Sequence, residues 1–160
     1  MAIEIERKFL VVGNAWRSEV SKSVELGQGY LSQEAGRASV RVRVEADRAT
    51  LNIKAAVVGS ARAEYEYAIP LAEGRELLET LCVGRLQKIR HYVKRDDVTW
   101  EIDEFLGDNA GLIVAEIELG RVDQAFPRPS WLGRELTEDR RYYNHHLALH
   151  PYRTWSQDAP

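Results

Sequence analysis

Charged and apolar residues alternate with a period of two along much of this chain, and this alternation limits the folds available to it. In "SVRVRVEA", Arg41 and Arg43 share a side with Glu45, while valines take the other side. Such a period is typical of a β-strand with two different faces. The segments that follow it are Ile3–Leu10, Val24–Leu31, Ala38–Ala46, Thr50–Ala55, Arg62–Ile69, Gln87–Arg95, Val98–Phe105 and Leu112–Leu119. Short polar links such as "EADRAT" and "KRDD" predict antiparallel hairpins between these strands.

Helical patterns are fewer. Asn14 is expected to cap a short helix beginning "AWRSEV", and "AEGRELLETLCV" places three leucines on one helical stripe. After a proline-rich connector, "FPRPSW", the stretch "LTEDRRYYNHHLALH" predicts a C-terminal helix with Thr137 as its N-cap and Pro151 beyond its end. The sequence therefore predicts an α+β protein with one domain over residues 1–160. Its β-rich body spans 1–119, and its connector and C-terminal helix span 120–160.

The composition excludes several classes of protein. The chain has 160 residues, of which 44% are hydrophobic and 29% charged, as in folded domains rather than disordered chains. A net charge of −3 predicts no nucleic-acid partner. The lone Cys82 suits a reducing compartment, and no apolar run or signal-like N-terminus is present. We expect a cytoplasmic monomer or homodimer with no membrane association.

The charges are sorted by strand. Glu4 and Glu6 share a side with Lys8, whereas other strands carry mainly bases on their polar side. Read singly, each such side is the solvent face of an amphipathic strand, or one half of isolated ion pairs. Read together, the sides are almost uniformly ionised, and like charges recur roughly 6–7 Å apart along a strand. Such repulsion is explained if the sheet closes into a barrel around a ligand.

The lumen of that barrel would carry both halves of a metal–polyphosphate site. Carboxylates would bind a hard divalent cation, and Arg and Lys would bind phosphate oxygens. The acids are Glu4, Glu6, Glu64, Glu66, Asp103, Glu116 and Glu118, and the bases are Lys8, Arg41, Arg43, Lys54, Arg62, Lys88 and Arg90.

The stretch "EIERKFL" resembles the Glu-x-Glu-x-Lys signature of the CYTH superfamily, the triphosphate tunnel metalloenzymes. The resemblance continues, in the family's order, through "SVRVRV", "LNIKAAVVGSARAEYEYAIP", "LQKIRHYV", "WEIDEFLG" and "LIVAEIEL". It covers about residues 3–119 and implies a closed antiparallel barrel of eight strands with a charged lumen. Helices would pack outside this barrel, and the C-terminal helix would close one end through Tyr142, Tyr143, Leu147 and Leu149.

The resemblance also implies roles for individual residues. Metal would be held by Glu4, Glu6, Glu116 and Glu118, with Asp103 and Glu64 completing or supporting the shell. The phosphates would be bound by Lys8, Arg41, Arg43, Lys54, Arg62, Lys88 and Arg90. We count Glu4, Glu6, Lys8 and Lys88 as catalytic. The sequence does not identify the group that accepts the proton of water; a tunnel carboxylate and Lys88 are two candidates. Glu66 and Glu101 are expected in supporting roles, and Tyr30 and Tyr92 as packing.

The expected activity is Mg²⁺- or Mn²⁺-dependent hydrolysis of inorganic triphosphate to pyrophosphate and phosphate, as in short bacterial members. Three alternatives stay open: a class IV-type adenylyl cyclase, a nucleoside or thiamine triphosphatase, and a non-catalytic polyphosphate-binding protein. We expect no zinc site at His145 and His146, because adjacent helical residues face different ways. We expect Cys82 to be a buried hydrophobe, and Arg134, Arg140 and Arg141 to lie on an exposed helix face.

Overall fold

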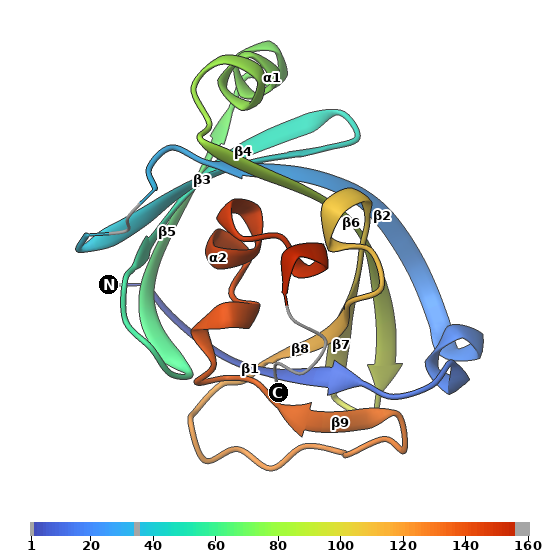
Figure 1. The fold of residues 1–160 in the computed structure, drawn as a ribbon. Coiled ribbons are helices and arrows are strands. Elements are labelled where there is room, and N and C mark those ends of the chain that lie inside the picture. The colour runs from blue at the N-terminus through green and yellow to red at the C-terminus, as the bar shows by residue number, and fades with distance from the viewer. Residues whose placement is uncertain (1, 34–35, 156–160) are drawn as a thin grey trace.

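Eight antiparallel strands close into a barrel in the computed structural model, which describes residues 2–33 and 36–155 (Figure 1). Around the barrel the order is β5-β4-β3-β2-β6-β7-β8-β1, and β1 pairs again with β5. The strands are β1 (Ile3–Val11), β2 (Val20–Tyr30), β3 (Ala38–Glu45), β4 (Arg48–Ala55), β5 (Ala61–Ile69), β6 (Gly84–Arg95), β7 (Val98–Phe105) and β8 (Ile113–Glu118). The expected eight-stranded barrel is therefore confirmed.

Strand β2 is longer and better embedded than its sequence suggests. It pairs with β3 on one edge and with β6 along most of the other, although Gly27 and Gly29 weaken its pattern. A side chain at Gly29 would not fit, because its Cβ would lie 2.7 Å from the Sγ of Cys82. The glycine therefore lets the segment that contains Cys82 pack directly on the barrel wall. Cys82 itself is only partly buried.

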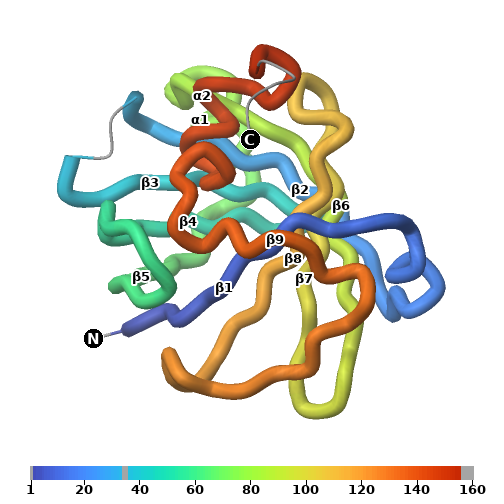
Figure 2. The backbone as a smooth tube through the Cα atoms, turned by 60° about the horizontal axis from the view of Figure 1, so that its bottom comes forward, coloured from blue at the N-terminus to red at the C-terminus, as the bar shows by residue number. Residues whose placement is uncertain are grey.

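A ninth strand, β9 (Leu132–Glu135), was not expected from the sequence. It pairs with the last residues of β1, where Phe9 lies opposite Glu135, and it lies outside the barrel (Figure 2). Between β5 and β9 the edge of β1 is completed by a loop. The backbone N–H of Lys8 donates to Thr137 Oγ1 at 3.0 Å, and its carbonyl accepts from the Leu136 N–H at 2.7 Å.

The helices divide between the outside and the inside of the barrel. Helix α1 (Leu71–Thr80) packs outside on β3 and β4, so closely that a Cβ on Gly74 would lie 2.4 Å from the Cβ of Ala49. Helix α2 (Asn144–Leu149) lies within the ring of strands in Figure 1 and contacts β6 and β2. Short 3-10 helices cover Ala15–Glu19, Gly107–Asn109, Arg140–Tyr142 and Tyr152–Thr154.

The C-terminal helix is shorter than predicted, and its expected cap is wrong. Thr137 lies in a turn after β9, where its hydroxyl accepts from the Lys8 backbone N–H and donates to the Glu135 carboxylate. Helix α2 begins after Tyr143 and has no side-chain cap. Asn14 likewise precedes its 3-10 helix without a side-chain capping bond. At Thr137 the tertiary contact with Lys8 outweighs the local capping preference, whereas the Asn14 side chain accepts from the Arg17 side chain at 3.4 Å instead of from a backbone N–H.

Apolar residues form two clusters, one outside the barrel wall and one at its plugged end. The outer cluster lies on the outward faces of β1, β6, β7 and β8 and is covered by the chain that leads to β9. It contains Phe9, Trp16, Val93, Trp100, Ile102, Ala115, Ile117, Leu119 and Trp131. The end cluster joins α2 to the barrel and contains Leu86, Phe105, Leu112, Val114, Leu136, Tyr142 and Leu147. The expected plug at one end is therefore present.

Along several strands the inward-facing residues change from apolar at the plug to charged further in. On β1 the inward side reads Leu10, Lys8, Glu6, and on β6 it reads Leu86, Lys88. The same strands therefore build the closed end and the wall of the lumen. Within the described part of the chain, no helix is long and apolar enough to cross a membrane.

Candidate active site

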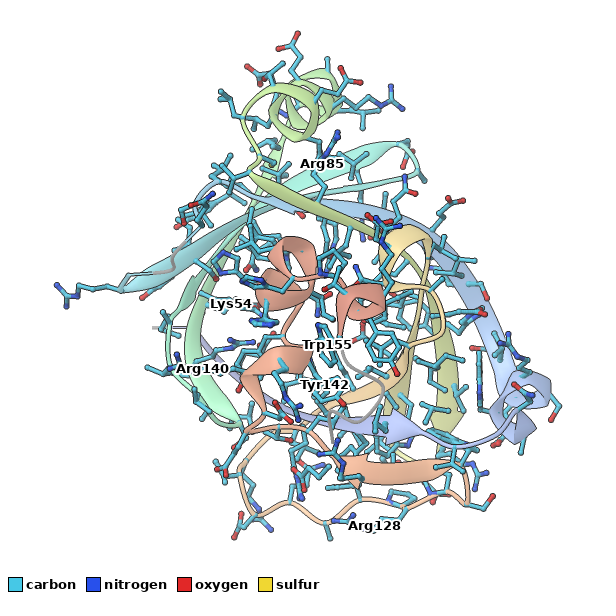
Figure 3. All side chains as sticks on the ribbon, viewed as in Figure 1. Lys54, Arg85, Arg128, Arg140, Tyr142 and Trp155 are labelled. Carbon is cyan, nitrogen blue, oxygen red and sulfur yellow. The ribbon has the colours of Figure 1, made fainter. Side chains whose placement is uncertain are left out.

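A cavity of about 650 Å³ occupies the barrel between the plug and the opposite mouth. Figure 3 shows Lys54 and Arg140 pointing into the interior near α2. Of the residues expected from the sequence, the cavity is lined by Glu4, Glu6, Glu64, Glu66, Glu116, Glu118, Lys8, Arg41, Arg43, Lys54, Arg62, Lys88 and Arg90. Tyr30, Tyr92 and Glu101 also line it, whereas Asp103 is not among the lining residues.

Two acids face each other where β7 meets β8, and an arginine neutralises them. Glu101 lies opposite Glu116 in the ladder, an arrangement in which like charges destabilise a sheet. Arg90 forms an ion pair with Glu101, and its Nη2 lies 3.3 Å from Glu116 Oε2. Lys8 Nζ lies 3.3 Å from Glu116 Oε1. Although desolvation opposes ionisation, the charges of Lys8 and Arg90 hold the pKa of Glu116 well below its ordinary value.

A second pair of facing acids lies where β1 meets β8. Glu6 is directly opposite Glu118, and both line the cavity. Within the described residues, no ion pair or hydrogen bond joins either carboxylate to a cation. Desolvation and the neighbouring carboxylates Glu116 and Glu4 raise the pKa of Glu6 to about 8. A cation bound between these carboxylates would favour the ionised form of Glu6, and the described residues do not supply one.

Glu4 and Glu64 form a further acidic group around Lys54. Lys54 Nζ lies 2.8 Å from Glu4 Oε1 and 3.2 Å from Glu64 Oε2. Desolvation and a hydrogen bond with Glu64 raise the pKa of Glu4. Desolvation acts the same way on Glu64, but its hydrogen bonds to Glu4 and Lys54 keep its pKa below the ordinary value. Arg62 Nε lies 3.8 Å from Glu4 Oε1, so one lysine and one arginine serve these two acids.

Of the lumen cations expected from the sequence, Arg41 and Arg43 have the fewest partners among the described residues. Neither forms an ion pair with any described acid, and the Nε of Arg41 is buried with no hydrogen-bond partner. Arg43 Nε donates to the neutral Gln28 Oε1 at 3.3 Å. Desolvation and the charges of Arg41 and Arg90 lower the pKa of Arg43 to about 10. A buried guanidinium without a carboxylate is costly unless an anion binds it.

Asp103 lies behind the cavity wall rather than on it. It is fully buried, its Oδ1 accepts from Arg90 Nε at 2.8 Å, and its Oδ2 accepts from Arg90 Nη2 at 2.9 Å and Lys88 Nζ at 2.7 Å. Against desolvation, the charges of Arg90 and Lys88 lower its pKa. Both its oxygens are therefore committed to holding bases.

The C-terminal segment contributes contacts to the lumen lysines that the sequence analysis did not predict. Lys8 Nζ donates to the backbone carbonyl of Tyr142 at 3.2 Å, and Lys88 Nζ donates to Asn144 Oδ1 at 2.9 Å. No motif marks Asn144, because its place depends on how α2 enters the barrel. Gln28 alternates with Tyr30 on β2, so the strand period could have placed it inward.

Three of the histidines, His145, His146 and His150, also lie at the plugged end. His145 stacks on Tyr30 and contacts the Ser32 carbonyl through Nε2 at 2.8 Å, and His146 packs against His150. Across residues 2–33 and 36–155, no three His, Cys, Asp or Glu side chains converge as a ready-made metal site. Mg²⁺ does not require one, since it is commonly bound by one or two carboxylates together with substrate phosphates and water. The Glu6 and Glu118 pair fits that donor chemistry.

Fold and site together define a barrel protein with a charged internal tunnel. The chain belongs to the CYTH domain family, whose model matches residues 2–147. A relative from Acetivibrio thermocellus, named inorganic triphosphatase, is 44% identical over 158 residues, covering 98% of this chain and 100% of the relative. A relative of the same name from Nitrosomonas europaea is 36% identical over 149 residues, covering 91% and 97%. A crystal structure of an inorganic triphosphatase superposes with a TM-score of 0.68 at 35% identity, covering 93% and 96%.

Proposed function

We propose that this protein hydrolyses inorganic triphosphate to pyrophosphate and phosphate with the help of Mg²⁺ or Mn²⁺. One observation carries the proposal: the cavity holds two arginines without acidic partners and two facing acids without a cation, as judged among the described residues. A metal-chelated polyphosphate would satisfy both sets at once. The names of the two relatives, which match nearly the whole chain, support the same activity.

Glu6 and Glu118 are the carboxylates best placed to hold the metal, with Glu4 beside Glu6 on the inward side of β1. Glu64 and Glu116 would support the site from their ion pairs with Lys54, Lys8 and Arg90. We assign Asp103 to positioning Lys88 and Arg90 rather than to metal binding, because all its oxygens contact these bases.

Arg41 and Arg43 would take the phosphate oxygens most directly, because they need not first give up a carboxylate. The remaining lumen bases, Lys8, Lys54, Arg62, Lys88 and Arg90, would add charge while staying fixed by their acidic partners. Phosphoryl transfer depends mainly on such positioning and on charge stabilisation. When bound, the divalent metal supplies further charge neutralisation of the phosphates and lowers the pKa of coordinated water.

The attacking water must lose a proton, and two groups are suited to accept it near neutral pH. Glu6 has a pKa raised to about 8 by desolvation and by Glu116. Lys88 has a pKa lowered to about 7 by desolvation, against the opposing charge of Asp103. Efficient proton transfer favours groups whose pKa is near the working pH. We therefore retain both a carboxylate and Lys88 as candidates.

The remaining expectations concern the protein's setting. A small triphosphate is the proposed partner, and the net charge of −3 gives no support for nucleic acid. The cytoplasm stays the proposed location, supported by the single free Cys82. A monomer or homodimer stays the expected state.

The test is a substrate and metal panel. Purified protein is assayed for phosphate release from tripolyphosphate, ATP, GTP and thiamine triphosphate with each of Mg²⁺, Mn²⁺ and EDTA. We expect tripolyphosphate with Mg²⁺ or Mn²⁺ to give the highest kcat/KM, and EDTA to abolish release. Glu79→Gln, an exposed acid on α1 far from the lumen, serves as the control and should keep full activity.

The same panel separates the alternatives. Cyclic AMP formed from ATP would identify an adenylyl cyclase, and a higher kcat/KM for a nucleotide or for thiamine triphosphate would identify an organic substrate. Tight binding of tripolyphosphate by calorimetry, with no turnover under any metal, would identify a binding protein. Full activity in EDTA would overturn the metal-dependent proposal.

A further inference from the structure

The Lys88 amino group is held by one residue of the barrel wall and one residue of the C-terminal plug. Its Nζ donates to Asp103 Oδ2 at 2.7 Å on β7 and to Asn144 Oδ1 at 2.9 Å on α2. An ammonium group has three N–H donors, so two of them are fixed by these acceptors. Lys88 also lines the cavity, although only 1% of its surface is exposed. The one remaining position on the nitrogen is thus available to the cavity.

The orientation of the Asn144 amide is fixed by its neighbours. Lysine can only donate, so the atom of Asn144 that faces Lys88 is the oxygen. Arg43 can only donate as well, so the oxygen of Gln28 faces Arg43 and its nitrogen faces Asn144, where Nε2 donates to Oδ1 at 3.1 Å. Both lone pairs of Asn144 Oδ1 are therefore used, one by Lys88 and one by Gln28.

These bonds form one continuous chain through the lumen wall. It runs from Arg43 through Gln28 and Asn144 to Lys88, and then through Asp103 to Arg90. Gln28, Lys88 and Asp103 are each at most 1% exposed, so water does not compete for their hydrogen bonds. Three lumen cations are in this way held in fixed relative positions by neutral amides and one carboxylate.

Asn144 is the member of this chain that the barrel strands do not supply. Asn144 enters the lumen because α2 packs into the end cluster. In that cluster Leu147 is fully buried and the exposed fraction of Tyr142 is 5%. The preceding residues attach the same segment to Lys8, through the Tyr142 carbonyl at 3.2 Å. The apolar plug therefore delivers polar contacts to two lumen lysines.

We infer that Asn144 is a positioning residue for the reaction, which acts by holding the Lys88 amino group toward the bound phosphate chain. The inference rests on the proposed triphosphatase function and adds to it a residue from outside the charged strands. Its replacement by leucine, of similar size, removes the acceptor from Lys88. The amino group then gains rotational freedom, and the side chain of Gln28 loses its acceptor as well.

A double-mutant cycle tests the inference. Wild type, Asn144→Leu, Lys88→Met and the double variant are compared for tripolyphosphate hydrolysis with Mg²⁺. We expect Asn144→Leu to lower kcat by about tenfold to a hundredfold, the range for a hydrogen bond to a charged group, with a smaller change in KM. In the Lys88→Met background the same substitution should change kcat less than about twofold, because its target is gone.

Binding gives a second readout that does not require turnover. The affinity for tripolyphosphate is measured by calorimetry in EDTA for the same four proteins. Asn144→Leu should weaken binding about fivefold or more in the presence of Lys88, and less than about twofold in the Lys88→Met background. This cycle stays measurable if Lys88→Met is inactive.

Ala148→Gly provides the matched control on α2. It removes a methyl group and loosens the helix without touching a polar lumen group, so it reports what mere loosening of the plug does. We expect its kcat to stay within about threefold of wild type at an equal or greater loss of melting temperature.

The outcomes separate the two proposals. Wild type that fails to hydrolyse tripolyphosphate removes the proposed function. If wild type is active, either of two results overturns the positioning role alone. One is an Asn144→Leu effect that is undiminished in the Lys88→Met background, and the other is an Asn144→Leu effect no larger than that of Ala148→Gly.

Discussion

Strand β8 contributes one glutamate to each of two facing glutamate pairs, one with β7 and one with β1. The two pairs differ in whether a basic side chain neutralises them. The pair Glu101 and Glu116 is joined by Arg90, which contacts both carboxylates and is itself anchored on Asp103. The pair Glu6 and Glu118 receives no such cation from the described residues. The first pair is complete as structure, whereas the second is stabilised only when something positive binds from the cavity.

The lumen arginines show the same division. Arg90 contacts three carboxylates. Desolvation lowers the pKa of Arg90, but the charge of Asp103 outweighs it, so that this pKa lies above its ordinary value. Arg41 has no described acidic partner, and its Nε is unpaired. Saturated groups therefore fix the shape of the tunnel, and unsaturated groups of each sign are left for the two halves of the ligand. The predictions below test that division.

Glu6→Gln should have the largest effect on activity. It removes a charge from the pair that lacks a cation, so kcat/KM with Mg²⁺ is expected to fall about a thousandfold, or ~4 kcal/mol of transition-state stabilisation. Initial rates across a magnesium titration measure the loss. The folded protein should be no less stable, because desolvation and the charges of Glu116 and Glu4 disfavour the ionised form of Glu6, which glutamine cannot adopt. A variant with near-normal activity at saturating Mg²⁺ would show that Glu6 does not serve the metal.

Arg90→Met should have the largest effect on stability. It leaves Asp103, Glu101 and Glu116 buried without their main counter-ion, at a cost of about 3 kcal/mol, or roughly 10 °C in melting temperature. Thermal unfolding followed by circular dichroism measures it. Added Mg²⁺ should not restore the loss, because the missing cation is structural. Full recovery with Mg²⁺ would mean that the two acidic pairs are equivalent.

Arg41→Met should have a smaller effect and the opposite sign on stability. Because Arg41 is buried without an acidic partner among the described residues, an apolar residue of similar length should raise the free energy of unfolding by about 1 kcal/mol. The same change should raise KM for tripolyphosphate about tenfold, since a phosphate-binding guanidinium is lost. Denaturant unfolding and steady-state kinetics are measured on one preparation. A loss of stability like that of Arg90→Met would show that Arg41 has a structural partner after all.

The alternation of residues was enough to predict the barrel and most of its lumen. The inward side of β1 follows directly from Glu4, Glu6 and Lys8, and the same rule places Arg41 and Arg43 on β3. Strand period fixes which face a residue takes, because a shift by one residue would turn every charge outward. It does not fix how deep a residue lies behind that face: Asp103, expected to complete or support the metal shell, contacts Lys88 and Arg90 and does not line the cavity.

The C-terminal third was less predictable, since tertiary contacts decide its local structure. Thr137 looks like a helix cap, but its hydroxyl completes the edge of β1 at Lys8. β9 forms only because β1 continues beyond its pairing with β5, and its four residues carry no alternation. Asn144 reaches Lys88 because apolar packing seats α2, and no spacing in the sequence records that contact.

The smallest expected effect is the pH dependence of stability in the metal-free protein, which reports the uncompensated pair directly. Glu6 titrates at about 8 in the folded state against 4.5 as its ordinary value, so between these values the folded protein binds more protons than the unfolded chain. Its favourable contribution is complete below about pH 4.5 and is lost as pH rises through 8. In EDTA, wild type should therefore lose a few degrees of melting temperature relative to Glu6→Gln between pH 5 and pH 8. Lys88, with its pKa lowered to about 7, affects stability in the opposite direction above pH 7, but Lys88 is present in both proteins and its contribution cancels in the comparison.

Mg²⁺ added at pH 8 should stabilise wild type more than the variant, since the ion binds the ionised Glu6 and Glu118 pair. Equal pH slopes for the two proteins would mean that Glu6 is already ionised and neutralised within the fold, and the contrast between the two acidic pairs would then fail.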